Sequence, residues 1–148
     1  MAYIKELAKY EGQEVELKGW NAQKRDSKTI VFMTMRDGTG FAQCIIDLNA
    51  VGENSFDAAK RLPQESSLTV KGKVVKDERQ IGGYEVHVTS LNVIAVAEAY
   101  PITPKEHGVD FLMDNRHLWL RSKNQWAIMR VRNEIIFAIH TFFQQRGF

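Results

Sequence analysis

The sequence contains a single cysteine, three prolines and no long hydrophobic run. Because Cys44 has no second cysteine to pair with, an intrachain disulfide and a paired-cysteine metal or redox site are excluded. No apolar run approaches the roughly 18 residues that a membrane span requires. The residues after Met1 also lack the charged and apolar segments of a signal peptide. These absences predict a soluble, cytoplasmic protein that does not enter a membrane.

The charge balance is mild, with a net charge of +2 at pH 7 in 148 residues. Phosphate binding depends on clustered Lys and Arg rather than on their total. The net charge alone is therefore too small to identify a nucleic-acid-binding protein. The length suits one domain and a fragment of another, and two complete enzymatic domains would not fit. Two local basic clusters are present: Lys24, Arg25 and Lys28, and then Lys71, Lys73, Lys76 and Arg79. The second could equally be a solvated polar face.

A hairpin is predicted where two alternating segments flank an Asp-Gly-Thr-Gly turn at residues 37–40. Alternation in residues 29–36 puts Phe32 opposite a Val-Met-Met face, and in residues 41–47 it puts Gln43 opposite the cysteine. If the strands pair about the turn, Phe32 and Gln43 share a face. An aromatic ring that stacks on a base beside an amide that bonds its edge is typical of proteins that read single-stranded nucleic acid. The alternative is a core Phe and a solvated Gln.

The remaining elements predict an all-β fold. Residues 4–10 could form one or two helical turns, and residues 55–62 have helical spacing that ends at Pro63. Alternating strands are expected at residues 14–20, 67–75 and 84–96, in addition to the two of the hairpin. Five short strands with one helix between the third and the fourth predict an OB-fold barrel over residues 1–98. The face around its second and third strands commonly binds oligonucleotides.

The composition changes after the fifth strand. Residues 99–116 contain two of the three prolines and little periodicity, so we expect a hinge or linker there. In residues 117–148 a long helix is predicted, with Ser122 and Gln125 in a capping-box pattern and Gly147 at its end. Its apolar stripe is wider than that of a solvated surface helix. Either the stripe packs on the barrel, or it needs a partner that the chain hardly contains.

Several long motifs resemble one enzyme family. They are the GW of the first strand, the RD at Arg25, the F-x-x-x-R-D-G-x-G of the hairpin, ESSLTVKGKVVKDER, GYEVHVTSLNVI and YPITPKEHGVDFLMDNRHLWLRS. Together they resemble the amino-terminal part of asparaginyl-tRNA synthetases, class II enzymes of the subgroup that includes the aspartyl and lysyl synthetases. The resemblance covers residues 12–148 and implies an anticodon-binding barrel followed by the start of a catalytic domain.

The resemblance also implies roles for individual residues. Phe32 would stack on the middle anticodon base, a uridine, while Gln43 and Arg25 would hydrogen-bond that base. Glu85 would read the preceding base, guanine or its modified form; otherwise it is a solvated strand carboxylate. A carboxylate can accept hydrogen bonds from guanine N–H groups, and a guanidinium can donate hydrogen bonds to uracil oxygens. Possible contacts to the RNA backbone are Lys24, Lys28, Lys71 and Lys73, whereas Trp20 and His87 are expected to be structural.

No catalytic centre is expected in these residues. Motifs two and three of class II synthetases, which bind ATP and the aminoacyl-adenylate, are not present, and the four histidines lack metal-ligand spacing. RNEIIFAIHTFFQQRGF resembles the helix of motif one, which forms the homodimer interface of the family. The resemblance implies that a complete enzyme attaches asparagine to its tRNA with ATP and Mg²⁺, and that this stretch alone is inactive.

Two other interpretations stay open. The chain could be a free-standing OB-fold protein that binds single-stranded nucleic acid with little sequence preference. It could also act mainly as a dimerisation element through its long helix. Anticodon discrimination separates the first of these from a synthetase module, and mass measurement with and without the helix tests the second.

Overall fold

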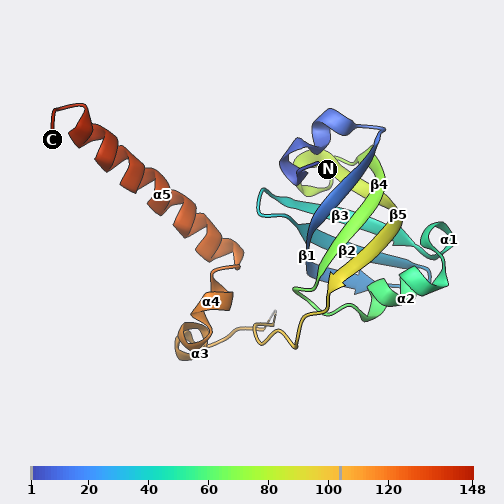
Figure 1. Cartoon of the computed structure of the whole chain (residues 1–148). Helices are drawn as coiled ribbons and strands as arrows, with labels where there is room; N and C mark the ends of the chain where they lie inside the picture. Colours follow the sequence, from blue (N-terminus) through green and yellow to red (C-terminus); the bar gives the residue numbers. More distant parts are fainter. Residues whose placement is uncertain (1, 104) are drawn as a thin grey trace. The chain divides into compact units, whose positions relative to one another are not determined.

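In a computed structural model, which describes residues 2–103 and 105–148, five strands close into a barrel (Figure 1). The order around the barrel is β1-β2-β3-β5-β4, and β1 and β4 pair to close it. β3 and β5 run parallel and the other neighbours run antiparallel. The strands are β1 (Glu14–Asp26), β2 (Ile30–Arg36), β3 (Phe41–Asp47), β4 (Ser67–Lys76) and β5 (Tyr84–Ala95). The predicted five-stranded OB-fold barrel is confirmed.

Strict alternation builds the barrel core. In β2 and β3 every second residue is buried, which gives a smooth inner wall of aliphatic and thioether side chains. The fully buried residues include Leu17, Val31, Met33, Met35, Cys44, Ile46, Leu68, Val70, Val74 and Val86. Burial raises the pKa of the Cys44 thiol to about 12, so this cysteine is a core side chain and not a nucleophile. The residues between these positions face outward and are available for binding.

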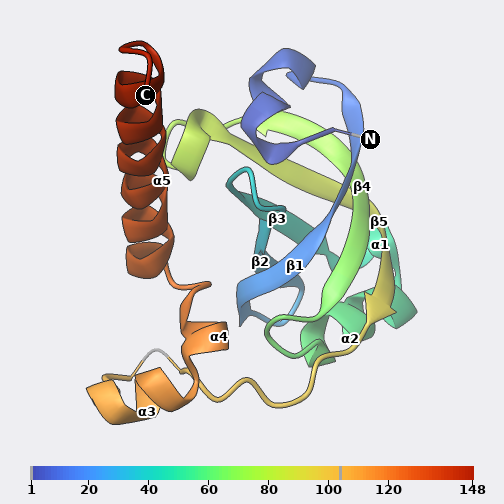
Figure 2. The same cartoon turned by 60° about the vertical axis from the view of Figure 1, so that its left-hand side comes forward.

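Helical segments cover the two ends of the barrel (Figures 1 and 2). The 3₁₀ segment η1 (Ile4–Tyr10) buries Ile4 and Leu7 at one end. At the other end, α2 (Glu53–Arg61) buries Phe56 and Ala59. The short helix α1 (Leu48–Val51), which periodicity did not predict, precedes α2 and ends at Gly52. Both ends of the core are therefore covered by helical segments, and the outer wall of the barrel remains exposed.

β1 is longer than the alternation predicts, since it continues past residue 20 to Asp26. A bulge between Asn21 and Gln23 shifts its register against β2, and the buried Asn21 amide donates to two carbonyls of the α2–β4 connection. A bulge breaks the two-residue period, so this half of the strand carries no alternating signal. Just before the bulge, a Cβ on Gly19 would lie 2.2 Å from the Arg36 carbonyl oxygen, which excludes any larger residue.

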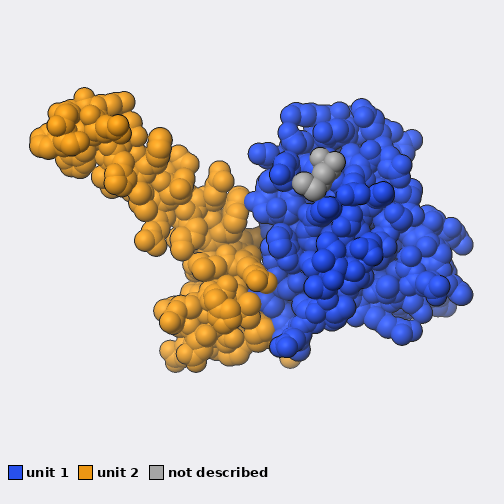
Figure 3. Space-filling model, in the orientation of Figure 1, with its two compact units in different colours: residues 1–100 blue, residues 101–148 orange. Residues whose placement is uncertain are grey.

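The chain divides into two units, residues 1–100 and 101–148, which Figure 3 colours separately. The second unit contains α3 (Val109–Asp114), α4 (Arg116–Trp119) and α5 (Lys123–Gln144). The Ser122 hydroxyl accepts from the backbone N–H of Gln125, as the capping-box pattern predicts. α3 lies inside the segment where a linker without periodicity was expected. No described residue of α5 is buried, and no described helix is long and apolar enough to cross a membrane.

Candidate nucleic-acid interface

A concavity of about 370 Å³ lies on the outer wall of the barrel. The four residues that the sequence singles out for base contact all line it: Arg25 near the end of β1, Phe32 on β2, Gln43 on β3 and Glu85 on β5. Each of these four candidates thus comes from a different strand. The volume lies within the range of roughly 300 to 1,000 Å³ that is common for small-ligand sites.

Strand register places these side chains on one face. Gln43 is in register with Glu85 across the parallel pair, and Phe32 is in register with Ile45, two residues further along β3. Cys44 lies between Gln43 and Ile45 and points into the core. Because the core fixes the inward residues, their neighbours are held outward with little freedom. The predicted shared face of Phe32 and Gln43 is confirmed.

Arg25 and Phe32 are in contact. The Arg25 guanidinium carbon lies 5.3 Å from the centre of the Phe32 ring, and the two residues are register partners on β1 and β2. A cation over a ring at an exposed site contributes about 0.5–1 kcal/mol, whereas a base stacked on a ring contributes about 1–3 kcal/mol. A base could therefore compete with Arg25 for the ring.

Glu85 is the acidic residue among the four candidates, and its side chain is only 12% exposed. One carboxylate oxygen, Oε2, accepts from Gln43 Nε2 at 3.2 Å. The other, Oε1, lies 2.8 Å from His87 Nε2. A carboxylate that is nearly removed from water requires such partners. The site therefore offers an amide, a guanidinium, an aromatic ring and an oriented carboxylate to a ligand.

The sequence did not assign the other residues of the wall to the site. The β4–β5 loop contributes Asp77, Arg79 and Gln80, and β5 contributes His87 beside Glu85. Arg79 donates to Asp77 from its backbone N–H and its side chain, and these bonds hold the pKa of the Asp77 carboxyl well below its usual range. Alternation in β5 could have placed His87 with Glu85, but a loop conformation leaves no periodic signal.

A model of the tRNA anti-codon family, described as an OB-fold nucleic acid binding domain, matches residues 15–94 of the chain. This span runs from the second residue of β1 almost to the end of β5 and includes every base-contact candidate. The chain belongs to this family of anticodon-type OB-fold domains.

Relatives of the anticodon-type OB-fold domain are similar over nearly the whole chain. An asparagine–tRNA ligase of Symbiobacterium thermophilum is 52% identical over 145 residues, which are 98% of this chain and 33% of that protein. The ligase of Thermus thermophilus is 50% identical over 147 residues, 99% of this chain and 34% of that protein. The chain thus spans about a third of the length of these curated relatives. The resemblance indicated by the sequence motifs is confirmed.

A solved structure shares both the barrel and the helical unit. The asparaginyl-tRNA synthetase of Pyrococcus horikoshii, complexed with asparaginyl-adenylate, is 37% identical, with a TM-score of 0.90 over 99% of this chain and 35% of that one. The aspartyl-tRNA synthetase of Entamoeba histolytica is 21% identical with a TM-score of 0.85, over 99% of this chain and 38% of that one, and shows the likeness of fold alone.

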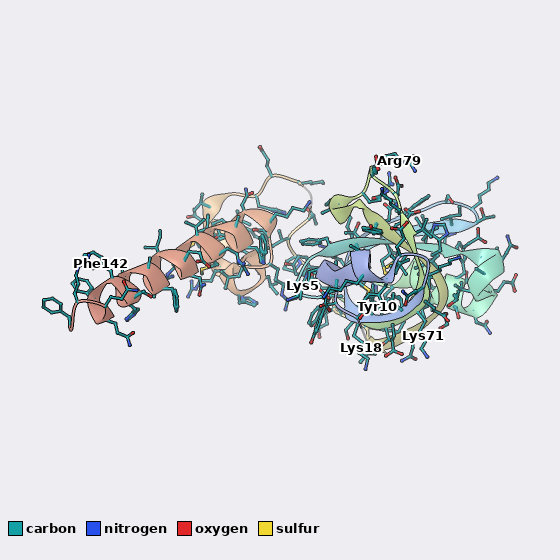
Figure 4. The ribbon with its side chains drawn as sticks, turned by 90° about the horizontal axis from the view of Figure 1, so that it is seen from above. Lys5, Tyr10, Lys18, Lys71, Arg79 and Phe142 are labelled. Atoms are coloured by element: carbon teal, nitrogen blue, oxygen red, sulfur yellow. The ribbon has the colours of Figure 1, made fainter. Side chains whose placement is uncertain are left out.

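The four candidate lysines of the anticodon-type domain are spread around it. Lys24 donates to carbonyls at the end of α2, those of Ala59 and Lys60. Lys28 is exposed in the turn between β1 and β2, and Lys73 is exposed on β4. Lys71 forms an ion pair with Glu16 at 3.6 Å, and Figure 4 shows it on the side of the barrel opposite Arg79. The structure brings together the base-contact candidates but not these lysines.

Over residues 2–103 and 105–148, no group of three or more His, Cys, Asp or Glu side chains is arranged to hold a metal ion. The chemistry available in the concavity is that of hydrogen bonding, stacking and charge.

Proposed function

We propose that the barrel binds the anticodon loop of the tRNA for asparagine in the concavity around Phe32. The observation that carries the proposal is the convergence of Arg25, Phe32, Gln43 and Glu85, from four strands, on one hollow of the outer wall. The names of the relatives, asparagine–tRNA ligases, support this choice of RNA.

Within this proposal, Phe32 stacks on the central uracil of the anticodon. Gln43 and Arg25 bond the edge of that uracil, since an amide provides both a donor and an acceptor and a guanidinium provides donors for carbonyl oxygens. Glu85 accepts from the N–H donors of the preceding guanine. Gln43 lies between Phe32 and Glu85 on the sheet, which supports the reading of two successive bases.

Electrostatic contacts to the phosphates complete the proposed interface. Lys28 is exposed in the turn that joins the strands of Arg25 and Phe32, and Lys73 is in register with His87 at the edge of the concavity. Both are well placed to neutralise phosphate charge. Lys24 is tethered to α2 and Lys71 is paired with Glu16 on the far side, so these two lysines receive less support as backbone contacts.

We also propose the activity of a complete protein that contains this chain. It joins asparagine to its tRNA with ATP and Mg²⁺ through an aminoacyl-adenylate, and it acts as a homodimer. Residues 1–98 form the anticodon-binding domain, residues 99–116 the hinge, and residues 117–148 part of the catalytic domain with its dimer-forming helix. The exposed apolar side chains of α5, among them Ile128, Ile135 and Phe142, support a helix that is covered by other protein.

Binding of anticodon stem-loops to the full chain tests the proposal. Exchange of the central uracil for cytosine reverses the hydrogen-bonding edge that faces Gln43 and Arg25, and so leaves polar groups badly paired. The affinity should fall about tenfold at matched salt, which is within the usual worth of one good base contact. Equal affinity for both stem-loops would instead indicate an OB-fold module that binds single strands without sequence preference.

A further inference from the structure

His87 is held on the outer wall by the core of the barrel. Its neighbours in β5, Val86 and Val88, are both buried, so the strand cannot rotate to turn the imidazole away. Across the sheet it is in register with Ile45 on β3 and Lys73 on β4. The ring is 52% exposed and lines the concavity, which makes it accessible to a ligand as well as to its own neighbour.

Both carboxylate oxygens of Glu85 have a hydrogen-bond partner. Gln43 Nε2 donates to Oε2 at 3.2 Å, and His87 Nε2 lies 2.8 Å from Oε1. A carboxylate only accepts, so Nε2 is the protonated nitrogen of the imidazole in this pair. With one donor on each oxygen, the plane of the carboxylate is fixed. Without His87, Gln43 would hold one oxygen and the group could still turn about that bond.

An oriented carboxylate can distinguish guanine from the other bases. Each of its oxygens has about two acceptor positions, so the donors from Gln43 and His87 leave one position on each oxygen. Guanine presents two N–H donors side by side on its Watson-Crick edge and can fill both. Adenine presents an acceptor in place of one of them, which would face a carboxylate oxygen. The selectivity therefore depends on both oxygens facing the base at once.

We infer that His87 is the positioning residue that makes Glu85 selective for guanine at the base before the central uracil. This inference rests on the proposed function, since it requires the concavity to bind an anticodon loop. It assigns to His87 a role in specificity rather than in affinity alone. The imidazole acts through the carboxylate and needs no contact with the base.

Two substitutions of His87 test this role in the full chain. His87→Leu removes the donor to Oε1 and places an apolar side chain at the same outward position. His87→Gln keeps an N–H donor at a similar distance along the side chain. Thr89→Ala, on the same face of β5 but outside the concavity, is the matched control. Each variant is titrated with three anticodon stem-loops, namely the guanine-uracil sequence, one with adenine for guanine and one with cytosine for the central uracil.

The ratio of affinities for guanine and adenine is the decisive measurement. We expect His87→Leu to reduce it by roughly five- to tenfold, as for the loss of one good base contact. In His87→Gln, as in the control, the ratio should stay within about twofold of its value in the unaltered chain. In all variants the preference for uracil over cytosine should persist, since that base lies over Phe32 and Gln43.

Three results would overturn the inference. They are an unchanged ratio in His87→Leu, an equal loss of affinity for all three stem-loops, and a loss in His87→Gln as large as that in His87→Leu. Failure of the proposed function is distinguishable from these, because the unaltered chain would then show no preference for uracil over cytosine at the central position.

Discussion

Arg36 on β2 forms an ion pair with Glu65, which lies in the connection between α2 and β4. The two side chains are only 16% and 7% exposed. Glu65 is the non-glycine residue with a positive φ, 68°, among those described. Arg36 also lies over the Trp20 ring, with its guanidinium carbon 5.2 Å from the ring centre. The pair thus holds a strained turn against the barrel beside the bulge of β1.

Removal of the Glu65 side chain should therefore destabilise the barrel strongly. Glu65→Ala leaves a largely buried guanidinium without its carboxylate, at an expected cost of about 3 kcal/mol in the free energy of unfolding. Glu65→Gly removes the same carboxylate, but glycine adopts the positive φ at this position without strain. The Gly variant should therefore be more stable than the Ala variant by about 1 kcal/mol. Urea unfolding measures both. The exposed Glu78→Ala is the control, and equal stability of the Ala and Gly variants would contradict strain at this residue.

Replacement of the stacking ring should affect RNA binding more than folding. Phe32 lies on the outer face of β2 and is only partly buried, so Phe32→Ala should weaken binding of the anticodon stem-loop by about 1–3 kcal/mol with little loss of stability. Calorimetric titration and thermal unfolding are measured on the same samples. Thr34→Ala, on the same face but outside the concavity, is the control. A stability loss of several kcal/mol, matched by the loss in binding, would identify Phe32 as a core residue.

A shortened chain that ends at Tyr100 should remain folded. The barrel buries its own core, and no described residue of α5 is buried. The shortened chain should therefore be monomeric in sedimentation and should bind the stem-loop, whereas the full chain should self-associate through the exposed apolar side chains of α5. Unfolding of the shortened chain would mean that the helix belongs to the core of the barrel.

The free energy of unfolding at acidic pH should depend on the bonds between Asp77 and Arg79 in the β4–β5 loop. The pKa of Asp77 is lowered by its bonds to Arg79, so its contribution to stability is fully present above its unfolded pKa of about 4. That contribution declines as the pH falls from there toward the folded pKa. The difference in unfolding free energy between the unaltered chain and Asp77→Asn should thus shrink between about pH 5 and pH 2. Asp57→Asn is the control for removal of one surface carboxylate, and a difference independent of pH would contradict the assignment.

The sequence predicts the parts of the fold that repeat. Alternation located β2 and β3 to within a residue, and with them the shared face of Phe32 and Gln43, because an inner wall of side chains imposes a strict period. The end of β1 was missed because the bulge at Asn21 breaks that period. His87 was expected to be structural, although its register places it beside Ile45 in the concavity. The loop from Asp77 to Gln80 follows no period, and only the three-dimensional structure places it at the site.

The pairing of β3 with β5 has a consequence for how the binding site comes into existence during folding. Gln43 and Glu85 are 42 positions apart in the sequence, and the two strands are joined only after the chain has passed through α2 and β4. Closing so long a loop is entropically costly, and such distant contacts form late. A chain whose hairpin has formed but whose barrel is open holds Phe32 and Gln43 without Glu85 or His87. The four base-contact candidates therefore come together only when β5 has paired with β3.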